Sequence, residues 1–181
     1  MPKDFDTWNE YKKIINNERR PVNFHEREIW WCKIGVNIGS EQDSYSGDFS
    51  RPILVLKKFT QTIFLGVPFT TTISEEQFRF HYVLRGRKTD LLLLHVRSFD
   101  SRRLGKKIGV MSVTDFNTVV GCVCSLLINV TDPTIVGSLE AEANVVKIRT
   151  SSRTYSIENQ RILSNFFGDR YFPRLTISSR M

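Results

Sequence analysis

Three polar side chains in the first half of the chain belong to types that act on phosphate esters: Glu41, Arg51 and Thr70. The guanidinium of Arg51 offers several donors to a phosphate under attack, and the ring of Pro52 restricts the backbone at that point. The hydroxyl of Thr70 can bind a phosphate oxygen or help to move a proton, and the carboxylate of Glu41 can accept one. On composition alone, a surface ion pair and an ordinary threonine-rich turn are the commoner interpretations of Arg51 and Thr70, and Glu41 fits a solvated loop.

A second group of side chains is suited to holding a nucleic acid. Gln42 carries donors and acceptors for a base edge, Thr71 follows Thr70, and His95 titrates near neutral pH. A cluster of cations could hold several phosphates, and its members are Arg97, Arg102, Arg103, Lys106 and Lys107. A solvated basic face for the cluster, and a structural role for His95, remain open.

These residues need elements to position them, and the pattern predicts one helix followed by several strands. In Asp4 to Ile15 apolar residues recur every three to four positions, and Thr7 with Glu10 matches a capping box. Asn16 to Asn23 is polar and contains Pro21, which predicts a linker. Strands are predicted at Glu28 to Ile34, Pro52 to Lys58, Thr62 to Val67, Gln77 to Leu84 and Asp90 to Arg97. Their close succession predicts an antiparallel, strongly curved sheet or a small barrel.

The remaining chain is predicted to add a turn, a strand and a helix. Ser98 to Leu104 fits one helical turn capped by Asp100, and Lys106 to Met111 fits a last short strand. Ser112 is expected to cap a helix whose apolar face consists of Phe116, Val119, Val120, Val123 and Leu127. Further on, Val145 to Ile148 and Ile162 to Phe167 are compatible with strand or helix, and Arg149 to Ser156 is predicted as exposed loop.

Composition narrows the class of protein. The chain has 181 residues, close to the size of one domain, and a formal net charge of +7, which favours polyanionic partners. Its polar start argues against a signal peptide, and no apolar run could span a bilayer, so a cytoplasmic protein without a membrane partner is expected. Cys32, Cys122 and Cys124 lack the number and spacing of a disulfide framework or a zinc site, and we expect them to be buried.

Several motifs occur in a fixed order along the chain. Glu28-Ile29-Trp30-Trp31 is followed by Gly39-Ser40-Glu41-Gln42 and by Arg51-Pro52-Ile53-Leu54-Val55. Val67-Pro68-Phe69-Thr70-Thr71 and the run from Val96 to Leu104 come next. In these motifs the chain resembles the MazF/PemK toxins, in which G-E-I-W, G-S-E-Q, R-P-x-L-V, V-P-x-T-T and I-R-x-[IL]-D-x-x-R-L appear in this order. The resemblance covers about Phe24 to Leu127.

The resemblance implies a fold, an activity and partners. The fold is mainly β with flanking helices, an SH3-like small barrel of the MazF/PemK/CcdB kind. The activity is that of a toxin that cuts single-stranded RNA without metal or cofactor, by attack of the 2′-hydroxyl, giving 2′,3′-cyclic phosphate and 5′-hydroxyl ends. Arg51 and Thr70 become catalytic residues with Glu41, and RNA contacts fall to Gln42, Thr71, His95, Arg97, Arg102 and Arg103. Similar proteins are homodimers bound by an antitoxin, and they meet DNA only through that antitoxin.

The chain also departs from the family pattern. The loop between Glu41 and Arg51 is longer than in short members, while Leu94 and His95 replace a polar residue and a glutamine, which bears on RNA sequence preference and rate. Two other interpretations remain: a non-catalytic toxin of the CcdB type that binds gyrase, and an inactive RNA-binding remnant. The expected organisation is a helix and linker in 1–22, the ribonuclease-like domain in 23–128 and an extension of unknown role in 129–181.

Overall fold

The computed structural model describes residues 3–44, 47–76 and 78–127, together with the backbone of 145–150 and 153–158. The chain forms two compact units, Met1–Ser112 and Val113–Met181. Within the described residues, no helix is both long and apolar enough to cross a bilayer. The division into segments 1–22, 23–128 and 129–181 stays a prediction.

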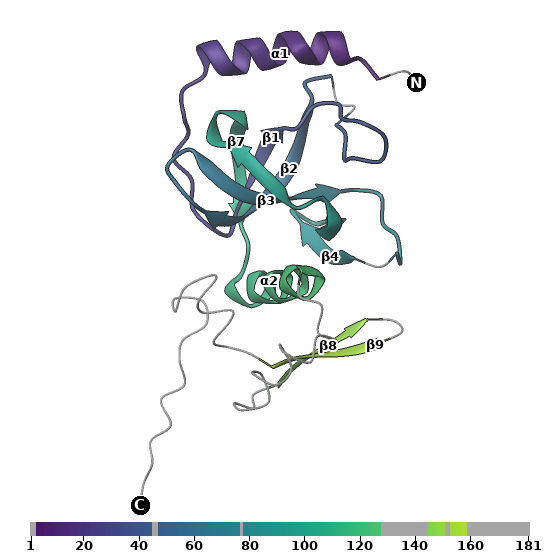
Figure 1. Cartoon of the computed structure of the whole chain (residues 1–181). Helices are drawn as coiled ribbons and strands as arrows, with labels where there is room; N and C mark the ends of the chain where they lie inside the picture. The colour runs from purple at the N-terminus through teal and green to yellow at the C-terminus, as the bar shows by residue number, and fades with distance from the viewer. Residues whose placement is uncertain (1–2, 45–46, 77, 128–144, 151–152, 159–181) are drawn as a thin grey trace, which may run out of the picture. The chain divides into compact units, whose positions relative to one another are not determined.

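The first unit begins with helix α1, Phe5–Glu18 (Figure 1). Its N-cap is Asp4, whose carboxylate accepts a hydrogen bond of 2.9 Å from the backbone NH of Thr7. The predicted capping box of Thr7 and Glu10 is therefore wrong, because Asp4 already satisfies the first turn three residues earlier. The helix also continues past Ile15 to Glu18, into the stretch predicted as linker.

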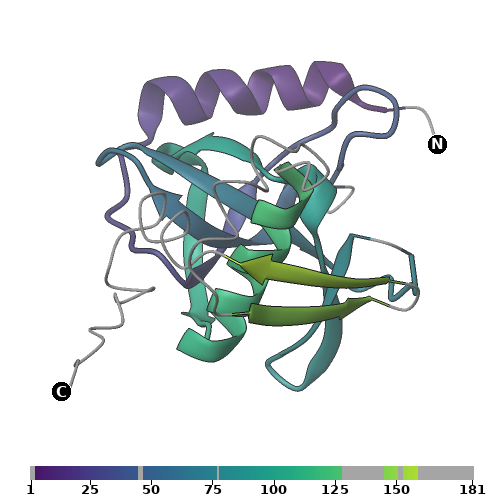
Figure 2. The same cartoon turned by 60° about the horizontal axis from the view of Figure 1, so that its bottom comes forward.

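An antiparallel sheet forms the body of this unit. Its strands are β1 (Glu28–Lys33), β2 (Ser50–Lys58), β3 (Ile63–Thr70), β4 (Arg79–Leu84), β5 (Arg87–Leu92), β6 (Arg97–Asp100) and β7 (Leu104–Val110). They follow the order β4-β5-β3-β2-β1-β7, and β6 pairs with β3. Figure 2 shows how the strands curl below α1. The expected fold class, a curved mainly β structure with flanking helices, is confirmed.

The predicted strand from Asp90 to Arg97 is divided in two. β5 ends at Leu92, a 3-10 turn covers Leu93–His95, and β6 starts at Arg97. Both strands pair with β3: β5 lies opposite Phe69 and Thr70, and β6 lies opposite Ile63–Gly66. The 3-10 turn therefore carries the chain from one end of β3 to the other. A continuous run of leucines carries no periodicity that would reveal such a break. The helical turn capped by Asp100 is confirmed as a 3-10 turn, Ser101–Arg103.

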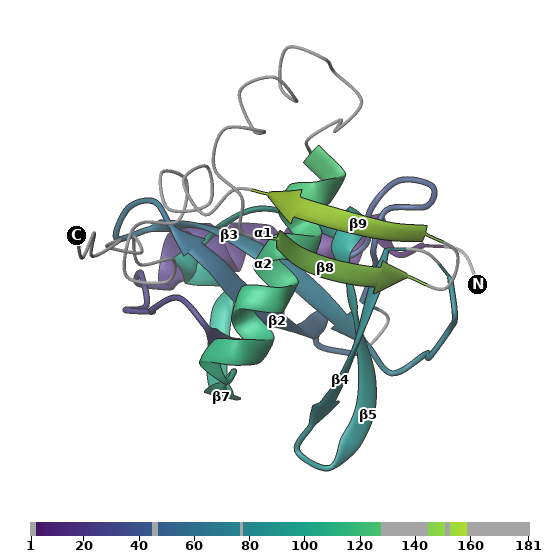
Figure 3. The ribbon, with the colours of Figure 1, turned by 90° about the horizontal axis from the view of Figure 1, so that it is seen from below.

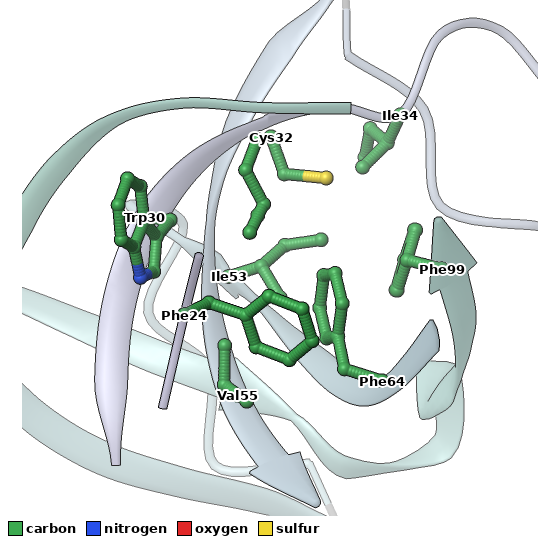
Figure 4. Packing of buried hydrophobic residues seen from close by; sticks show 9 residues of the cluster. Phe24, Trp30, Cys32, Ile34, Ile53, Val55, Phe64 and Phe99 are labelled. Atoms are coloured by element: carbon green, nitrogen blue, oxygen red, sulfur yellow. The ribbon is translucent and has the colours of Figure 1, made fainter. Parts of the chain in front are cut away.

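The interior of the curled sheet is filled by aromatic and aliphatic side chains (Figure 4). The Phe64 ring lies 5.0 Å from that of Phe24 and 5.6 Å from that of Phe99, measured between centroids. Strand alternation sends Trp30 inward, with 9% of its surface exposed, and leaves Trp31 at 43%. Of these two tryptophans, Trp30 is the core residue.

Helix α1 has its own small core against the loop that leads from β1 to β2. Trp8 and Ile15 are buried in one cluster with Val36 and Phe49. The Trp8 and Phe49 rings have centroids 5.3 Å apart. Gly35 lies beneath the indole with a φ of +77°, and a Cβ there would be 1.9 Å from Trp8 Cε2. Only glycine satisfies both the backbone conformation and this close approach.

The second unit contains helix α2, Val113–Leu127, and a hairpin of β8 (Val145–Thr150) and β9 (Arg153–Glu158). The predicted apolar face of α2 is buried at Phe116, Val119, Val120 and Val123, and Leu127 falls outside the described side chains. The predicted loop from Arg149 to Ser156 is wrong, because its β-branched and aromatic residues pair in the hairpin. The prediction for Ile162 to Phe167 lies outside the described residues. All three cysteines are free, and burial raises the pKa of Cys32 to about 12.

Candidate functional site

The guanidinium of Arg51 joins two segments that are distant in sequence. Arg51 lies near the start of β2, where its Cα is opposite that of Cys32 in β1. Its Nη1 donates to the carbonyl of Phe69 at 3.1 Å, and its Nη2 donates to the carbonyl of Asp43 at 2.6 Å. One cation is thereby fixed between the loop after β1 and the end of β3. Since Phe69 precedes Thr70, the predicted pair Arg51 and Thr70 is brought together.

Thr70 is the last residue of β3, where the sequence pattern had placed it just beyond a strand. Its hydroxyl accepts a hydrogen bond of 3.2 Å from the backbone NH of Thr72. This contact fixes the oxygen at the start of the turn and leaves the hydroxyl proton available for another acceptor. Thr71 is exposed on the same turn.

Glu41 and Gln42 belong to the loop that reaches Arg51. Gln42 Nε2 donates to the carbonyl of Asp43 at 2.9 Å, the same oxygen that binds Arg51. Glu41 and Gln42 also line a cavity of about 190 Å³. Its lining consists of Ile34, Glu41, Gln42, Pro68, Leu94, His95, Val96, Arg97 and Phe99. Four of the predicted site residues, Glu41, Gln42, His95 and Arg97, therefore surround one cavity.

A buried carboxylate holds this loop in place. Asp43 Oδ1 accepts from the backbone NH of Asn37 at 2.5 Å, and its Oδ2 lies 2.8 Å from Nζ of Lys3. Lys3 Nζ also donates to the carbonyls of Asn37 and Gly39, at 2.6 and 2.9 Å. Lys3, two residues before α1, is thus tied to the loop whose carbonyl binds Arg51.

His95 sits in the 3-10 turn between β5 and β6 and is half-buried. Burial lowers its pKa, and the charges of Arg97, Arg51 and Arg79 lower it further, against a smaller opposing effect of Glu41. The imidazole is therefore neutral near pH 7 and can accept or donate a hydrogen bond without carrying charge. Burial, followed by the charge of Arg103, also lowers the pKa of the Arg97 guanidinium.

The rest of the predicted basic cluster is spread over other contacts. Arg102 binds the Asp100 carboxylate through Nε and Nη2, both at 3.0 Å, and donates to Asn16 in α1 at 3.1 Å. Arg103 donates to the carbonyl of Lys33 at 2.9 Å and lies 5.5 Å above the Trp8 ring. Arg103 and Arg97 both line a larger cavity, of about 760 Å³, between α1 and the sheet. These contacts brace α1, and roles for Arg102 and Arg103 in RNA binding stay predictions.

Three polar residues near Thr70 were missed by the sequence reasoning: Arg79, His81 and Asp90. Asp90 is fully buried and is the Cα partner of Thr70. Arg79 Nη1 donates to the carbonyl of Thr72 at 2.9 Å, and His81 Nδ1 lies 2.7 Å from Asp90 Oδ1. A sequence signal for them does exist. Asp90 is a single acid directly before a run of leucines, and Arg79 and His81 are two basic residues that alternation places on one face of the neighbouring strand.

The described part of the chain contains no group of three His, Cys, Asp or Glu side chains arranged to hold a metal ion. The groups present at the site are a fixed cation, a hydroxyl, an exposed carboxylate and a neutral imidazole. Together they can bind an anionic phosphate and move protons around it.

Known proteins are similar to this chain. A family model described as the PemK-like, MazF-like toxin of type II toxin-antitoxin systems matches residues 25–127, more than half of the chain. No curated protein sequence matches.

Among solved structures, MazF from Deinococcus radiodurans is 22% identical with a TM-score of 0.47, covering 60% of this chain and 97% of that protein. The Mycobacterium tuberculosis toxin MazF-mt6 is 15% identical with a TM-score of 0.44, covering 56% and 96%. A mycobacterial endoribonuclease solved with its cognate antitoxin is 12% identical with a TM-score of 0.44, covering 56% and 92%.

Proposed function

The chain belongs to the PemK-like, MazF-like toxin family of type II toxin-antitoxin systems, and from this premise we propose that it is an endoribonuclease. Its substrate is single-stranded RNA, including messenger RNA, and cleavage needs no metal. The products are a 2′,3′-cyclic phosphate and a 5′-hydroxyl. The protein acts in the cytoplasm.

The observation that carries the proposal is the position of the Arg51 guanidinium. Two of its nitrogens are bound to the carbonyls of Asp43 and Phe69, which holds its plane between the loop after β1 and the end of β3. A fixed cation costs little reorganisation when charge develops on a phosphate in the transition state. Its planar donors also suit the oxygens of a phosphate better than a lysine ammonium does.

The reaction divides among the residues as follows. Glu41 accepts the proton of the 2′-hydroxyl, whose oxygen attacks the adjacent phosphorus in line. Arg51 stabilises the extra negative charge on the phosphate, and Thr70 binds a phosphate oxygen through its hydroxyl. The bond from phosphorus to the 5′-oxygen breaks, the leaving oxygen takes a proton from water to become the 5′-hydroxyl, and the proton on Glu41 returns to the solvent. No electron acceptor or donor is needed, and one proton is given up for each one taken.

RNA binding is assigned to the surroundings of the 190 Å³ cavity. Gln42 reads a base edge, and Thr71 and the neutral His95 add hydrogen bonds. Arg97 contributes charge at the cavity wall, with Arg102 and Arg103 extending the positive surface beyond it. Leu94, 63% exposed, offers an apolar contact to a base.

Partners follow from the family. We assign the chain a protein antitoxin that blocks the site, and an association with DNA only through that antitoxin. We also assign it a homodimeric state, in which the exposed Trp31 contributes an apolar contact between the two copies.

The test is incubation of the purified protein with a long unstructured RNA in EDTA, with the new ends mapped by sequencing. Discrete cuts are expected from the natural protein and from Arg20→Ala, a matched change at an exposed arginine outside the site. Arg51→Ala and Thr70→Val should lose the cuts while circular dichroism shows that both variants are still folded.

Intact RNA from a folded natural protein would overturn the proposal. It would favour the non-catalytic toxin of the CcdB type if gyrase were inhibited, and an RNA-binding remnant if RNA were bound without cleavage.

A further inference from the structure

His81 is held by a buried carboxylate beside the candidate site. Its Nδ1 lies 2.7 Å from Asp90 Oδ1, and since a carboxylate only accepts, the imidazole donates through this nitrogen. Asp90 has no exposed surface and also accepts a hydrogen bond of 3.1 Å from the backbone NH of Ser74. The side chain of His81 is 54% exposed, and Nε2, the ring nitrogen away from Asp90, lies 3.8 Å from the exposed carboxylate of Glu75.

The strand register places this pair next to Thr70. Asp90 in β5 is the Cα partner of Thr70 in β3 on one side and of His81 in β4 on the other. Residues directly opposite in antiparallel strands share one face, with Cβ atoms about 5 Å apart. Thr70, Asp90 and His81 therefore form one row across three strands, and Arg51 binds the carbonyl of Phe69, the residue before Thr70. Figure 3 shows the β4–β5 hairpin extending away from the rest of the sheet.

Arg79 adds a second cation to the same face, because it lies two residues before His81 on β4. Its Nη1 donates to the carbonyl of Thr72 at 2.9 Å and lies 3.6 Å from Asp90 Oδ2. Its Nε and Nη2 bind the exposed carboxylate of Glu76 at 3.0 and 2.6 Å. The row thus ends in two basic side chains that share Asp90, and Arg79 is also paired with the exposed Glu76.

We propose that His81 and Arg79, anchored on Asp90, form a phosphate-binding subsite for the RNA backbone outside the scissile linkage. This inference rests on the proposed function. A nucleotide whose scissile phosphate lies at Arg51 and Thr70 would bring a neighbouring phosphate along the row toward Nε2 of His81. Asp90 orients the imidazole so that the ring nitrogen away from it, Nε2, is the one left to meet a phosphate.

The charge of His81 makes this subsite sensitive to pH. The hydrogen bond to Asp90 is the largest cause that raises the pKa of His81, followed by the charges of Asp90 and Glu75, against desolvation. Glu75 Oε2 lies 3.8 Å from Nε2, and at 90% exposure that carboxylate can move aside for a phosphate. Arg79 is the cation on the same face. Because the cationic form binds phosphate, affinity should fall as pH rises through the raised pKa.

The test uses a mixed-sequence 2′-O-methyl RNA, which binds but cannot be cut, followed by fluorescence anisotropy in EDTA. His81→Gln keeps a polar side chain without a charge, and His25→Gln is the matched control, since His25 is also exposed and lies 3.5 Å from Glu28. At pH 6 the expected affinity of His81→Gln is about 3- to 10-fold below that of the natural protein. The slope of log affinity against log salt should shrink by about 0.7. At pH 9 the affinities should converge.

Outcomes separate this inference from the proposed function. If the natural protein neither binds this RNA nor cuts an ordinary one, the proposed function fails. If it binds, and His81→Gln shows the same affinity, salt slope and pH profile, the phosphate subsite is overturned.

Nitrogen NMR of the natural protein provides a check that needs no variant. A shift of the His81 Nε2 resonance on adding the 2′-O-methyl RNA is expected, and an unmoved resonance would equally overturn the subsite.

Discussion

Arg51 contacts two carbonyls through two nitrogens of one plane, and this geometry separates arginine from lysine. In Arg51→Lys the charge remains, but a single ammonium cannot bind both carbonyls and a phosphate at once. We expect cleavage to fall by about 100-fold or more, as for loss of an oriented donor to a developing anion. Single-turnover cleavage with excess protein measures this, and a rate within a few fold of the natural one would show that charge alone suffices.

His95 predicts a change of stability in acid. Burial, followed by Arg97, Arg51 and Arg79, lowers its folded pKa below the ordinary value of 6.5. Below pH 6.5 the unfolded chain therefore binds more protons at this residue, and the folded state loses stability until pH passes the lowered pKa. Urea unfolding should be measured for the natural protein and for His95→Gln at pH 7.5 and pH 5. From pH 7.5 to pH 5, the free energy of unfolding should fall more for the natural protein than for the variant. A pH-independent difference would contradict the assignment.

The sequence led to Arg51 and Thr70 because each stands in a short motif beside a proline. It did not lead to Asp90, His81 or Arg79, because their importance comes from register: Asp90 is opposite Thr70 and His81 only after β3, β4 and β5 pair. Similarly, sequence spacing grouped the cations after Val96, while the structure turns Arg102 toward Asp100 and Asn16.

Docking of α1 depends on Gly35. A Cβ at this position would overlap the Trp8 indole, at 1.9 Å from Cε2, whereas Gly39 also has a positive φ, of +55°, but open space around it. Gly35→Ala should destabilise the fold by about 1–3 kcal/mol more than Gly39→Ala. Both variants place an alanine at a positive φ, but only Gly35→Ala also clashes with the Trp8 ring. Chemical unfolding measures the difference, and equal losses would mean that Trp8 moves aside without cost.

Lys3 connects α1 to the candidate site. Its ammonium binds Asp43 and the carbonyls of Asn37 and Gly39, and the Asp43 carbonyl in turn binds Arg51. Lys3→Ala should lower kcat by about 3- to 10-fold with little change in KM, because the loop that orients Arg51 loosens while RNA contacts remain. Lys13→Ala, which breaks only an exposed pair with Glu10, is the control. A KM effect alone would mean that Lys3 binds RNA instead.

At the level of elements, alternation and turn residues predicted most strands of the first unit to within a few residues. Two failures come from strand pairing, which decides where a run of like residues is divided and which polar stretch becomes a strand. The leucines after Asp90 contain both the end of β5 and a 3-10 turn, and the polar stretch after Arg149 pairs as a hairpin. Neither outcome is encoded in local periodicity.

For the whole molecule, the proposed homodimer gives a direct expectation. Sedimentation of the purified protein should give twice the chain mass of 21.1 kDa. Trp31→Glu should shift it toward the single-chain mass, because a charge on an exposed apolar contact opposes association. A single-chain mass at micromolar concentration would remove the dimer from the proposal and leave Trp31 for the antitoxin.

In the proposed mechanism, Arg51, Thr70 and Glu41 promote cleavage by the 2′-hydroxyl of the RNA itself. The most direct measurement is cleavage, in EDTA, of an RNA carrying a single 2′-deoxy nucleotide 5′ to a mapped cut. We predict that this linkage stays intact while other cuts proceed, and that the unmodified site yields a 2′,3′-cyclic phosphate by mass spectrometry. Cleavage at the 2′-deoxy linkage would contradict the account, because the nucleophile would then come from elsewhere.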